Sequence, residues 1–423
     1  MKKYPHNLPK TTKGNEFDIV MTHKPDHPDN AHFKKYHDYF MPNVPLSDIA
    51  FQYGKDLYLY DYDGEQYLDF AAGIAVASLG HTHPLIRQAL SDQAYKVISV
   101  TGAYMTEPRA KCAELLIENS CMDQVFFCNS GTESIEAALK LVRKWSFETK
   151  GEDAKDIIVF NNSFHGRTIG AASLSAKRSN QPEFAPYPGN VHEAIFNDIG
   201  SVKDLISDTT AAIFVEPVQG EGGIYPADSD FLKDLRALCD DKNIALVFDE
   251  IQSGIGRLGT LFAYQSFKVE PDIICLAKGL GSGMPIGALL ARKEFSNHFT
   301  PGSHGSTYGS NPLATHVART VLQVISDPEF LKNINYQGDY LLTGLERLRQ
   351  EVPCITDLRG MGLMIGIEVN CDIKKALEKL RDNGLLATQA GKNTIRLTPP
   401  LVIEQGHADQ AIKILEKTLH EFS

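Results

Sequence analysis

The sequence lacks the features that would assign it to several common functional classes. Its seven cysteines are scattered over 423 residues and none forms a CxxC pair, so neither a zinc ribbon nor a disulfide framework is indicated. Several lie in apolar segments, which favours reduced thiols in a cytosolic protein. The net charge is -11 and basic residues form no block. This argues against nucleic acid as the main partner, because phosphate backbones bind clustered Lys and Arg.

Long apolar runs are also missing. No uninterrupted run is long enough to span a bilayer, and the first residues contain no apolar core of a secretory signal. We therefore expect a cytoplasmic protein without a membrane partner. The composition is that of a globular protein, with 43% hydrophobic and 22% charged residues, and the length suits two or more domains or one large α/β enzyme.

Short apolar runs alternate with amphipathic segments through the middle of the chain. Such runs are buried on both faces, as in a parallel sheet covered by helices. The runs occupy residues 124–128, 156–160, 211–216, 244–249 and 272–277. Helical spacing follows at 133–145 and 230–243. The alternation predicts an α/β domain with a mainly parallel central sheet covered by helices.

Composition and pattern divide the chain into three expected regions. Aromatic flanks around Asp63-Gly64, a strong two-residue turn signal, predict a hairpin over 57–70. Residues 1 to about 40 are polar, and we expect a loosely ordered arm or a short cap there. After Asn311-Pro312 the pattern becomes mainly helical around a strand at 362–369. We predict an N-terminal arm and hairpin packing with the small domain, a large α/β domain and a smaller α+β domain at 1–74, 75–310 and 311–423.

Polar residues stand directly after each apolar run, where ligands bind in open α/β sheets. If the five strands point the same way, one rim collects a small-residue turn, an aromatic side chain, an arginine, carboxylates and a lysine. These residues lie at 129–132, 161–168, Glu216, Asp249 and Lys278.

The first of these turns, Asn-Ser-Gly-Thr, leads into a helix. A helix N-terminus presents free N–H groups that hold phosphate. Gly131 would allow a close approach of the backbone, and Thr132 would add a hydroxyl. The alternative interpretation is a plain helix cap formed by Ser130 or Thr132.

Asp249 and Lys278 end two successive apolar runs. A buried carboxylate needs a partner, so Asp249 either caps a loop or faces a cation such as a protonated pyridine nitrogen. Lys278 either extends to water from a strand end or, losing charge through burial, serves as an amine nucleophile. A phosphate cradle, a pyridinium-pairing Asp and a Schiff-base Lys together describe a pyridoxal phosphate site.

Other chemistries fit the sequence less well. The segment Gly-Leu-Gly-Ser-Gly at 279–283 lacks the GxGxxG spacing, and its lysine precedes the glycines instead of following them as in a P-loop. Two histidines in the segment 80–84 have no further ligands in view, so no metal site is predicted. No GxSxG nucleophile elbow is present.

The segment 246–291 contains both Asp249 and Lys278. It resembles the signature segment of the class III pyridoxal-phosphate aminotransferases, which runs from the Asp to the Lys. The likeness runs from about Pro45 to the C-terminus and implies the aspartate-aminotransferase-like fold, PLP fold type I, with a smaller C-terminal α+β domain. Five motifs are most similar to the acetylornithine aminotransferases of that family: FCNSGTESIEAALKLVR, SFHGRT, VEPVQGEGG, STYGSNPLA and IRLTPPLVI.

The resemblance implies roles for individual residues. Lys278 would be the Schiff-base lysine and proton carrier, and Asp249 would pair with the ring nitrogen. Further cofactor-binding residues would be Gly131, Thr132, Phe164, Ile251, Gln252 and, from the neighbouring subunit, Thr307. Substrate-binding residues would be Arg167, Ser306, Arg396, Ile74 and Glu216. Glu216 is expected to screen Arg396 when the amino donor carries no carboxylate there.

The implied reaction moves the ω-amino group of N-acetylornithine, or a close N-acylated ornithine, to 2-oxoglutarate in a homodimer with interface active sites. Ile74 stands where ornithine δ-aminotransferases usually have Tyr, which disfavours plain ornithine. Succinylornithine, ornithine, 4-aminobutyrate and acetyl-lysine remain alternative donors. A racemase, aminomutase or decarboxylase on the same scaffold and a non-catalytic phosphate-binding protein are the alternative functions.

Overall fold

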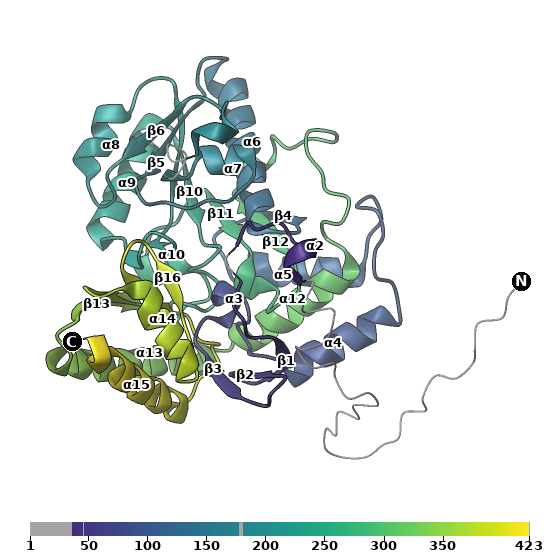
Figure 1. Cartoon of the computed structure of the whole chain (residues 1–423). Helices are drawn as coiled ribbons and strands as arrows, with labels where there is room; N and C mark the ends of the chain where they lie inside the picture. Colours follow the sequence, from purple (N-terminus) through teal and green to yellow (C-terminus); the bar gives the residue numbers. More distant parts are fainter. Residues whose placement is uncertain (1–35, 45, 177–180, 423) are drawn as a thin grey trace, which may run out of the picture. The chain divides into compact units, whose positions relative to one another are not determined.

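The computed structural model describes residues 36–44, 46–176 and 181–422 (Figure 1). The described residues fall into two compact units, one within 36–52 and 60–65 and the other within 53–59 and 66–422. In the first unit, the short helix α2 (Tyr36–Tyr39) stacks Tyr36 on Phe40 with ring centroids 4.2 Å apart. Most of the predicted N-terminal arm lies outside the described residues, and the three domains stay a prediction.

The second unit is built on a seven-stranded sheet with the order β4-β12-β11-β10-β7-β5-β6. Its strands are Gln124–Cys128 (β4), Asp156–Phe160 (β5), Val191–Ala194 (β6), Thr210–Val215 (β7), Ala245–Asp249 (β10), Ile273–Leu276 (β11) and Gly287–Ala291 (β12). Only β12 runs antiparallel to its neighbours β11 and β4, and the other pairs are parallel. The mainly parallel α/β sheet is confirmed, and the five apolar runs are five of its strands pointing the same way.

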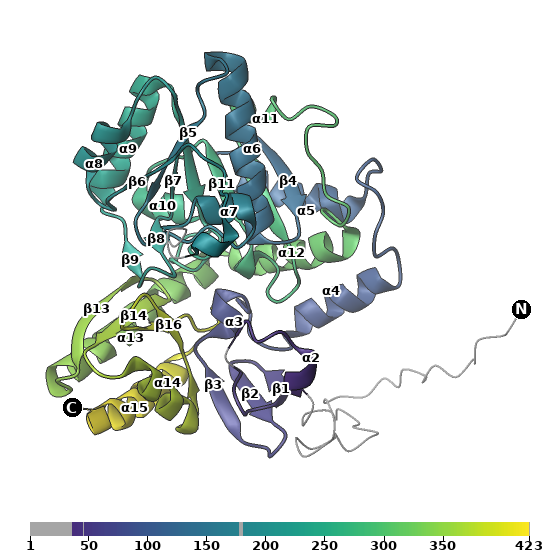
Figure 2. The same ribbon diagram turned by 45° about the horizontal axis from the view of Figure 1, so that its top comes forward.

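Both faces of this sheet are buried because side chains alternate along each strand. In β10, Leu246 and Phe248 belong to one core cluster, whereas Ala245 and Val247 belong to another. Helix α6 (Gly131–Lys150) covers the second face, and α9 (Ser229–Lys242) covers the first. Figures 1 and 2 show these helices on opposite sides of the strands. The continuous apolar runs are therefore explained by two-sided burial.

The C-terminal part of this unit carries an antiparallel sheet with the order β13-β14-β17-β16. These strands are Ile355–Met361 (β13), Met364–Val369 (β14), Thr388–Ala390 (β16) and Thr394–Leu397 (β17). The long helices around it are α12 (Pro312–Ile325), α13 (Pro328–Glu351), α14 (Ile373–Asp382) and α15 (Gln405–Leu419). Pro at N1 and the Asn311 cap, whose side chain accepts from Ala314 N, explain why α12 begins at the predicted boundary.

The predicted hairpin corresponds to β2 (Tyr58–Asp61) and β3 (Gln66–Asp69). In the second unit Asp69 N donates to Leu57 O at 2.8 Å. In the first unit the turn is closed by Asp61, whose Oδ1 accepts from Asp63 N and Glu65 N. Gly64 has φ +85°, which its missing Cβ makes inexpensive.

Shorter elements connect these parts. The strands are Phe51–Lys55 (β1), Val218–Gln219 (β8), Tyr225–Pro226 (β9) and Leu385–Leu386 (β15). The α-helices are Ala72–Ala75 (α3), Pro84–Ala94 (α4), Glu107–Glu118 (α5), Ile169–Ser173 (α7), Ile199–Leu205 (α8), Ala263–Phe267 (α10) and Lys293–Ser296 (α11). The 3-10 helices are Pro182–Phe184 (η2), Lys278–Leu280 (η3) and His420–Phe422 (η4).

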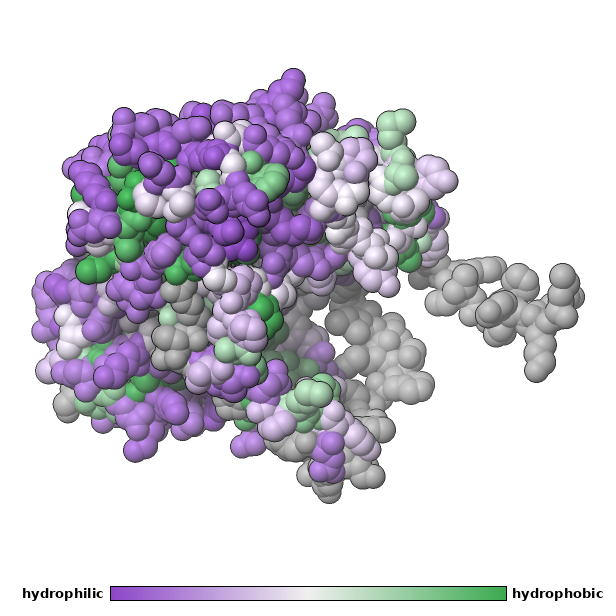
Figure 3. Space-filling view, turned by 90° about the horizontal axis from the view of Figure 1, so that it is seen from above, coloured by the Kyte–Doolittle hydropathy of each residue, from purple (hydrophilic) through white to green (hydrophobic). Residues whose placement is uncertain are grey.

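Three further features concern the surface, the cysteines and the length of the helices. Hydrophilic residues predominate on the face drawn in Figure 3. All seven cysteines lie in the described ranges and are free. Across those ranges every helix is too short or too polar to span a bilayer.

Candidate active site

A cavity of about 380 Å³ opens at the carboxyl ends of the parallel strands. Its wall is formed by the turns that follow β4, β5, β7, β10 and β11. The lining residues include Asn129, Ser130, Gly131, Thr132, Phe164, His165, Arg167, Glu216, Glu221, Asp249, Ile251, Gln252 and Lys278. The structure therefore brings together most of the residues that the sequence placed at this rim.

Lys278 follows β11 and begins the 3-10 helix η3. Its φ of +40° is unusual for a residue with a side chain and is a strained conformation of the kind found at functional sites. Burial lowers the pKa of Lys278 to about 8, although the carboxylate of Glu221 acts in the opposite direction. A larger fraction of neutral amine is thus available than an ordinary lysine would provide.

Asp249 ends β10 and is almost fully buried. Its Oδ1 accepts from Ile251 N at 3.0 Å, and its Oδ2 lies 2.7 Å from His165 Nδ1. Because a carboxylate only accepts, the Nδ1 of His165 carries the proton in this bond. Asp249 is therefore held in one orientation at the cavity wall by two donors.

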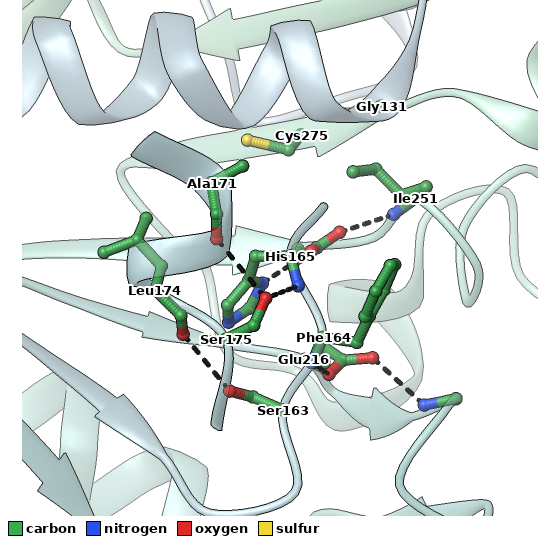
Figure 4. Close-up of polar contacts among 12 residues, drawn as sticks. Gly131, Ser163, Phe164, His165, Ala171, Leu174, Ser175, Glu216, Ile251 and Cys275 are labelled. Atoms are coloured by element: carbon green, nitrogen blue, oxygen red, sulfur yellow. Dashed lines mark hydrogen bonds and ion pairs between the residues drawn. The ribbon is translucent and has the colours of Figure 1, made fainter. Parts of the chain in front are cut away.

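His165 is a site residue that the sequence analysis did not single out, although it follows Phe164 in the motif SFHGRT. Its backbone N donates to Ser175 Oγ at 2.8 Å, and its Nε2 has no hydrogen-bond partner among the described residues. Burial disfavours the imidazolium, but the hydrogen bond and charge of Asp249 outweigh this and raise the pKa of His165. Figure 4 shows His165 next to Phe164 on one loop, beside Glu216 and Ile251.

The Asn-Ser-Gly-Thr turn is both a helix cap and a close-packed turn. Ser130 is the N-cap of α6, and its side chain accepts from Glu133 N, as the plain alternative predicted. A Cβ on Gly131 would lie 2.9 Å from Ile251 side-chain atoms, so only glycine fits without a shift. Thr132 Oγ1 is 2.9 Å from Thr168 Oγ1. The four residues of the turn line the cavity, and a helix start of this kind offers free N–H groups to an anion.

Phe164 and Arg167 come from the same loop after β5. The guanidinium carbon of Arg167 lies 5.3 Å from the centroid of the Phe164 ring, a cation–π distance. Phe164 N donates to Glu216 Oε1 at 2.9 Å. Ile251, which also lines the cavity, can pack on a flat ring placed between it and Phe164.

The structure corrects the expectation that Glu216 screens Arg396. Arg396, on β17 and buried, pairs with Glu221 through Nη1 and Oε1 and not with Glu216. The same Nη1 donates to Gln252 Oε1 at 3.2 Å, and Gln252 Nε2 donates to Glu221 at 3.3 Å. The sequence analysis chose the wrong carboxylate in the motif VEPVQGEGG because spacing alone did not show which one reaches the small sheet.

The two carboxylates have opposite environments. Glu216 accepts from Phe164 N and from Gly220 N at 3.0 Å, and burial raises its pKa to about 7. Burial would also raise the pKa of Glu221, but the charges of Arg396 and Lys278 outweigh it and lower that pKa. Glu221 is therefore the anionic partner of Arg396, whereas Glu216 orders the loop that carries Phe164.

Four expected site residues lie outside this set of lining residues: Ile74, Ser306, Thr307 and Arg396, whose partner Glu221 belongs to the set. Ser306 accepts from Asn129 Nδ2 at 3.0 Å, and Thr307 is exposed. Ile74 is 42% exposed, in a short helix whose φ angles are positive from Ala72 to Ala75. The single chain thus does not bring Thr307 or Ile74 to the cavity wall.

The residues present fit pyridoxal 5'-phosphate. An amine with a lowered pKa, a buried carboxylate with its oxygens oriented, a glycine turn at a helix start and two ring-packing side chains converge on one cavity. Asp249 would hold the ring nitrogen, Lys278 the aldehyde carbon, and Gly131 with Thr132 the phosphate. Among the described residues no group of three or more His, Cys, Asp or Glu could hold a metal ion.

This fold and cavity define a pyridoxal-phosphate enzyme of fold type I. A family model described as Aminotransferase class-III matches residues 40–419. The chain belongs to the class III aminotransferases, and pyridoxal 5'-phosphate is its cofactor.

Individual relatives extend over nearly the whole chain. It is 47% identical over 382 residues to an acetylornithine aminotransferase of Clostridium acetobutylicum, covering 90% of this chain and 99% of that one. A succinylornithine transaminase of Yersinia enterocolitica is 41% identical over 88% of this chain and 92% of its own length. Among solved structures, the ornithine aminotransferase of Toxoplasma gondii has a TM-score of 0.89 at 34% identity, covering 92% and 93%. The acetylornithine aminotransferase of Elizabethkingia anophelis has 0.83 at 33%, covering 92% and 98%.

Proposed function

We propose that this enzyme transfers the ω-amino group of N-acetylornithine, or of a close N-acylated ornithine, to 2-oxoglutarate, giving the semialdehyde and glutamate. The observation that carries the proposal is the pairing of Arg396 with Glu221 at the cavity edge. It gives the site an arginine whose charge a carboxylate already neutralises, and the charges of both groups act on the amine of Lys278.

Two substrates must use this arginine differently. A donor reacting through its ω-amine has no carboxylate beside the reacting carbon, so Glu221 can remain on Arg396. The acceptor 2-oxoglutarate carries a carboxylate beside its carbonyl, and Arg396 would bind it bidentately once Glu221 moves away. Arg167, at the cavity wall, would hold the carboxylate at the far end of either substrate.

The cofactor, when bound, supplies an electron sink for the electron pair left when a proton leaves the nitrogen-bearing carbon. Lys278 would accept that proton at Nζ and return it to another carbon, which its lowered pKa favours. Asp249, oriented by His165 and Ile251 N, would keep the ring nitrogen positively charged because an opposite charge nearby stabilises the charged form. Phe164 and Ile251 would hold the ring between them.

We further propose that the working enzyme is a cytoplasmic homodimer in which Thr307 reaches the phosphate site of the neighbouring subunit, with Ser306 near the substrate. Two observations support this: Thr307 is exposed, and it is not among the described residues that line the cavity of its own chain. A succinylated ornithine is the second candidate donor, because relatives named succinylornithine transaminase are 41% identical to this chain.

A donor panel tests the proposal. Purified enzyme would be supplied with 2-oxoglutarate and acetylornithine, succinylornithine, ornithine, 4-aminobutyrate or N-acetyl-lysine, and kcat/KM measured from the glutamate formed. The expected result is that an N-acylated ornithine is the best donor. Equal or faster turnover of ornithine or 4-aminobutyrate would overturn the donor assignment. Product formation without 2-oxoglutarate would indicate a racemase, aminomutase or decarboxylase instead.

A further inference from the structure

The segment that carries Thr307 is attached to the phosphate-binding turn of its own chain. Ser306 Oγ accepts from Asn129 Nδ2 at 3.0 Å and from Gly309 N at 2.9 Å. Asn129 immediately precedes Ser130, and it lines the cavity. One side chain therefore joins the two segments that the proposed dimer uses at different active sites.

Further contacts anchor the same segment to the same two elements, β4 and α6. A Cβ on Gly309 would lie 2.4 Å from Phe127 O at the end of β4, so the two backbones are in close contact. Lys140 on α6 donates to Ser303 O at 3.2 Å and lies 2.9 Å from His304 Nδ1. The segment that carries Thr307 is thus held against β4 and α6. The phosphate-binding turn connects these same two elements.

Asn129 is itself held in place by the start of α6. Its Nδ2 lies 3.0 Å from Glu133 Oε2, and its backbone N donates to the same carboxylate at 2.5 Å. Asn129 is thus bonded to Glu133 at the start of α6 and to Ser306. A displacement of the turn would therefore move Ser306 and, with it, the next residue, Thr307. Side-chain hydrogen bonds to backbone and neighbours of this kind set the rotamer of a supporting residue.

We propose that Asn129 is a positioning residue that acts in trans: through Ser306 it places Thr307 for the cofactor phosphate of the partner subunit. The inference rests on the proposed function, because it requires that Thr307 serve the neighbouring site. In a symmetric dimer it acts in both directions, so each phosphate turn supports the cofactor held on the other subunit as well as its own.

Heterodimers separate the cis effect from the trans effect. Two chains with different tags are co-expressed and purified by both tags, and one chain carries Lys278→Ala. Only the other chain then gives the visible absorbance of cofactor held on Lys278 and only it turns over. Asn129→Ala on the Lys278→Ala chain can affect that signal only in trans, and on the other chain only in cis.

We expect Asn129→Ala in trans to raise the dissociation constant for pyridoxal phosphate at the reporting site by about three- to tenfold, the size of one lost hydrogen bond. Ser306→Ala in trans should have the same effect, and the two together no more than one, because they remove the same contact. The matched control is Asn383→Ala in trans, which removes a similar bond, Asn383 Nδ2 to Thr418 Oγ1 at 2.9 Å, and should leave the constant unchanged.

An effect of Asn129→Ala and Ser306→Ala only in cis would overturn the inference. Thr307→Ala in trans tells this failure apart from a failure of the proposed dimer site. If Thr307→Ala weakens the cofactor in trans while the other two variants do not, the inference alone falls. If Thr307→Ala has no effect in trans, the assignment of Thr307 to the neighbouring site is wrong, and so is the inference that depends on it.

Discussion

The Nδ1 of His165 lies 2.7 Å from Oδ2 of Asp249, and both side chains are buried. Neither oxygen of this carboxylate is free to turn away, because Ile251 N holds the other one. The pair links the loop after β5 to the end of β10, two strands that are not neighbours in the sheet. It fixes the orientation of the Asp249 carboxylate at the cavity wall.

His165→Leu, whose side chain has no hydrogen-bond donor, should therefore lower kcat by about tenfold or more while the protein still folds and binds cofactor. The physical reason is the loss of a hydrogen bond to a charged group, which contributes about 1.5–3 kcal/mol. Steady-state kinetics with a saturating donor would measure the change, with cofactor content checked by absorbance. Unchanged kcat would mean that Ile251 N alone orients Asp249.

Replacing Lys278 by Met should remove both turnover and the visible absorbance of bound cofactor. In the cofactor-free protein it should also change the pH dependence of stability. The folded pKa of Lys278 is lowered from 10.5 to about 8, so the unfolded chain binds more protons between these values and wild-type stability should rise with pH across that window. Denaturant titrations from pH 7 to 10.5 would measure this rise.

The rise should be smaller in Lys278→Met, and it should persist in the control Lys293→Met, which changes an exposed lysine. An identical slope in wild type and Lys278→Met would show that Lys278 has an ordinary pKa in the folded protein.

Glu221→Ala should change substrate preference more than it changes folding. It leaves the guanidinium of Arg396 without its carboxylate, so a substrate carboxylate no longer competes with Glu221 for that position. We expect kcat/KM for glutamate as donor to increase relative to that for acetylornithine, by roughly tenfold for each 1.4 kcal/mol of differential binding. The ratio of the two values is the measurement, and an unchanged ratio would separate Arg396 from substrate binding.

Glu216→Ala is the matched comparison for that variant, since it removes the other carboxylate of the same loop. It leaves Phe164 N, in the loop after β5, and Gly220 N, in the segment after β7, without their acceptor. Both segments should become less ordered, so turnover should fall equally with glutamate and with acetylornithine. A selective change in donor preference here, absent in Glu221→Ala, would restore the original assignment of Glu216.

Glu216 also predicts a pH effect on stability. Its folded pKa is raised by burial from 4.5 to about 7, so the folded state binds more protons between these values and stability should fall as pH rises through the window. Glu216→Gln, which cannot titrate, should flatten this decline even if it lowers stability overall. Thermal unfolding of wild type and variant from pH 4.5 to 7.5 would reveal the difference, and parallel curves would contradict it.

The sequence by itself determined the sheet, most of the lining residues and the chemistry. Continuous apolar runs fixed the parallel strands because two-sided burial leaves no polar positions, and the residues after each run, such as Asp249 and Lys278, then had to share one rim. The strand β6 was missed because its segment Val-His-Glu-Ala contains polar residues and gives little apolar signal. The strand β12 was missed although Gly287–Ala291 is apolar and buried throughout.

Only the tertiary structure decided which side chains pair across that rim. His165 resembles any histidine in a loop until β5 and β10 are packed together, and Glu216 and Glu221 are indistinguishable until β17 brings Arg396 to one of them. Side-chain partners depend on distances between segments far apart in the chain, and these distances follow from packing and not from spacing along the sequence.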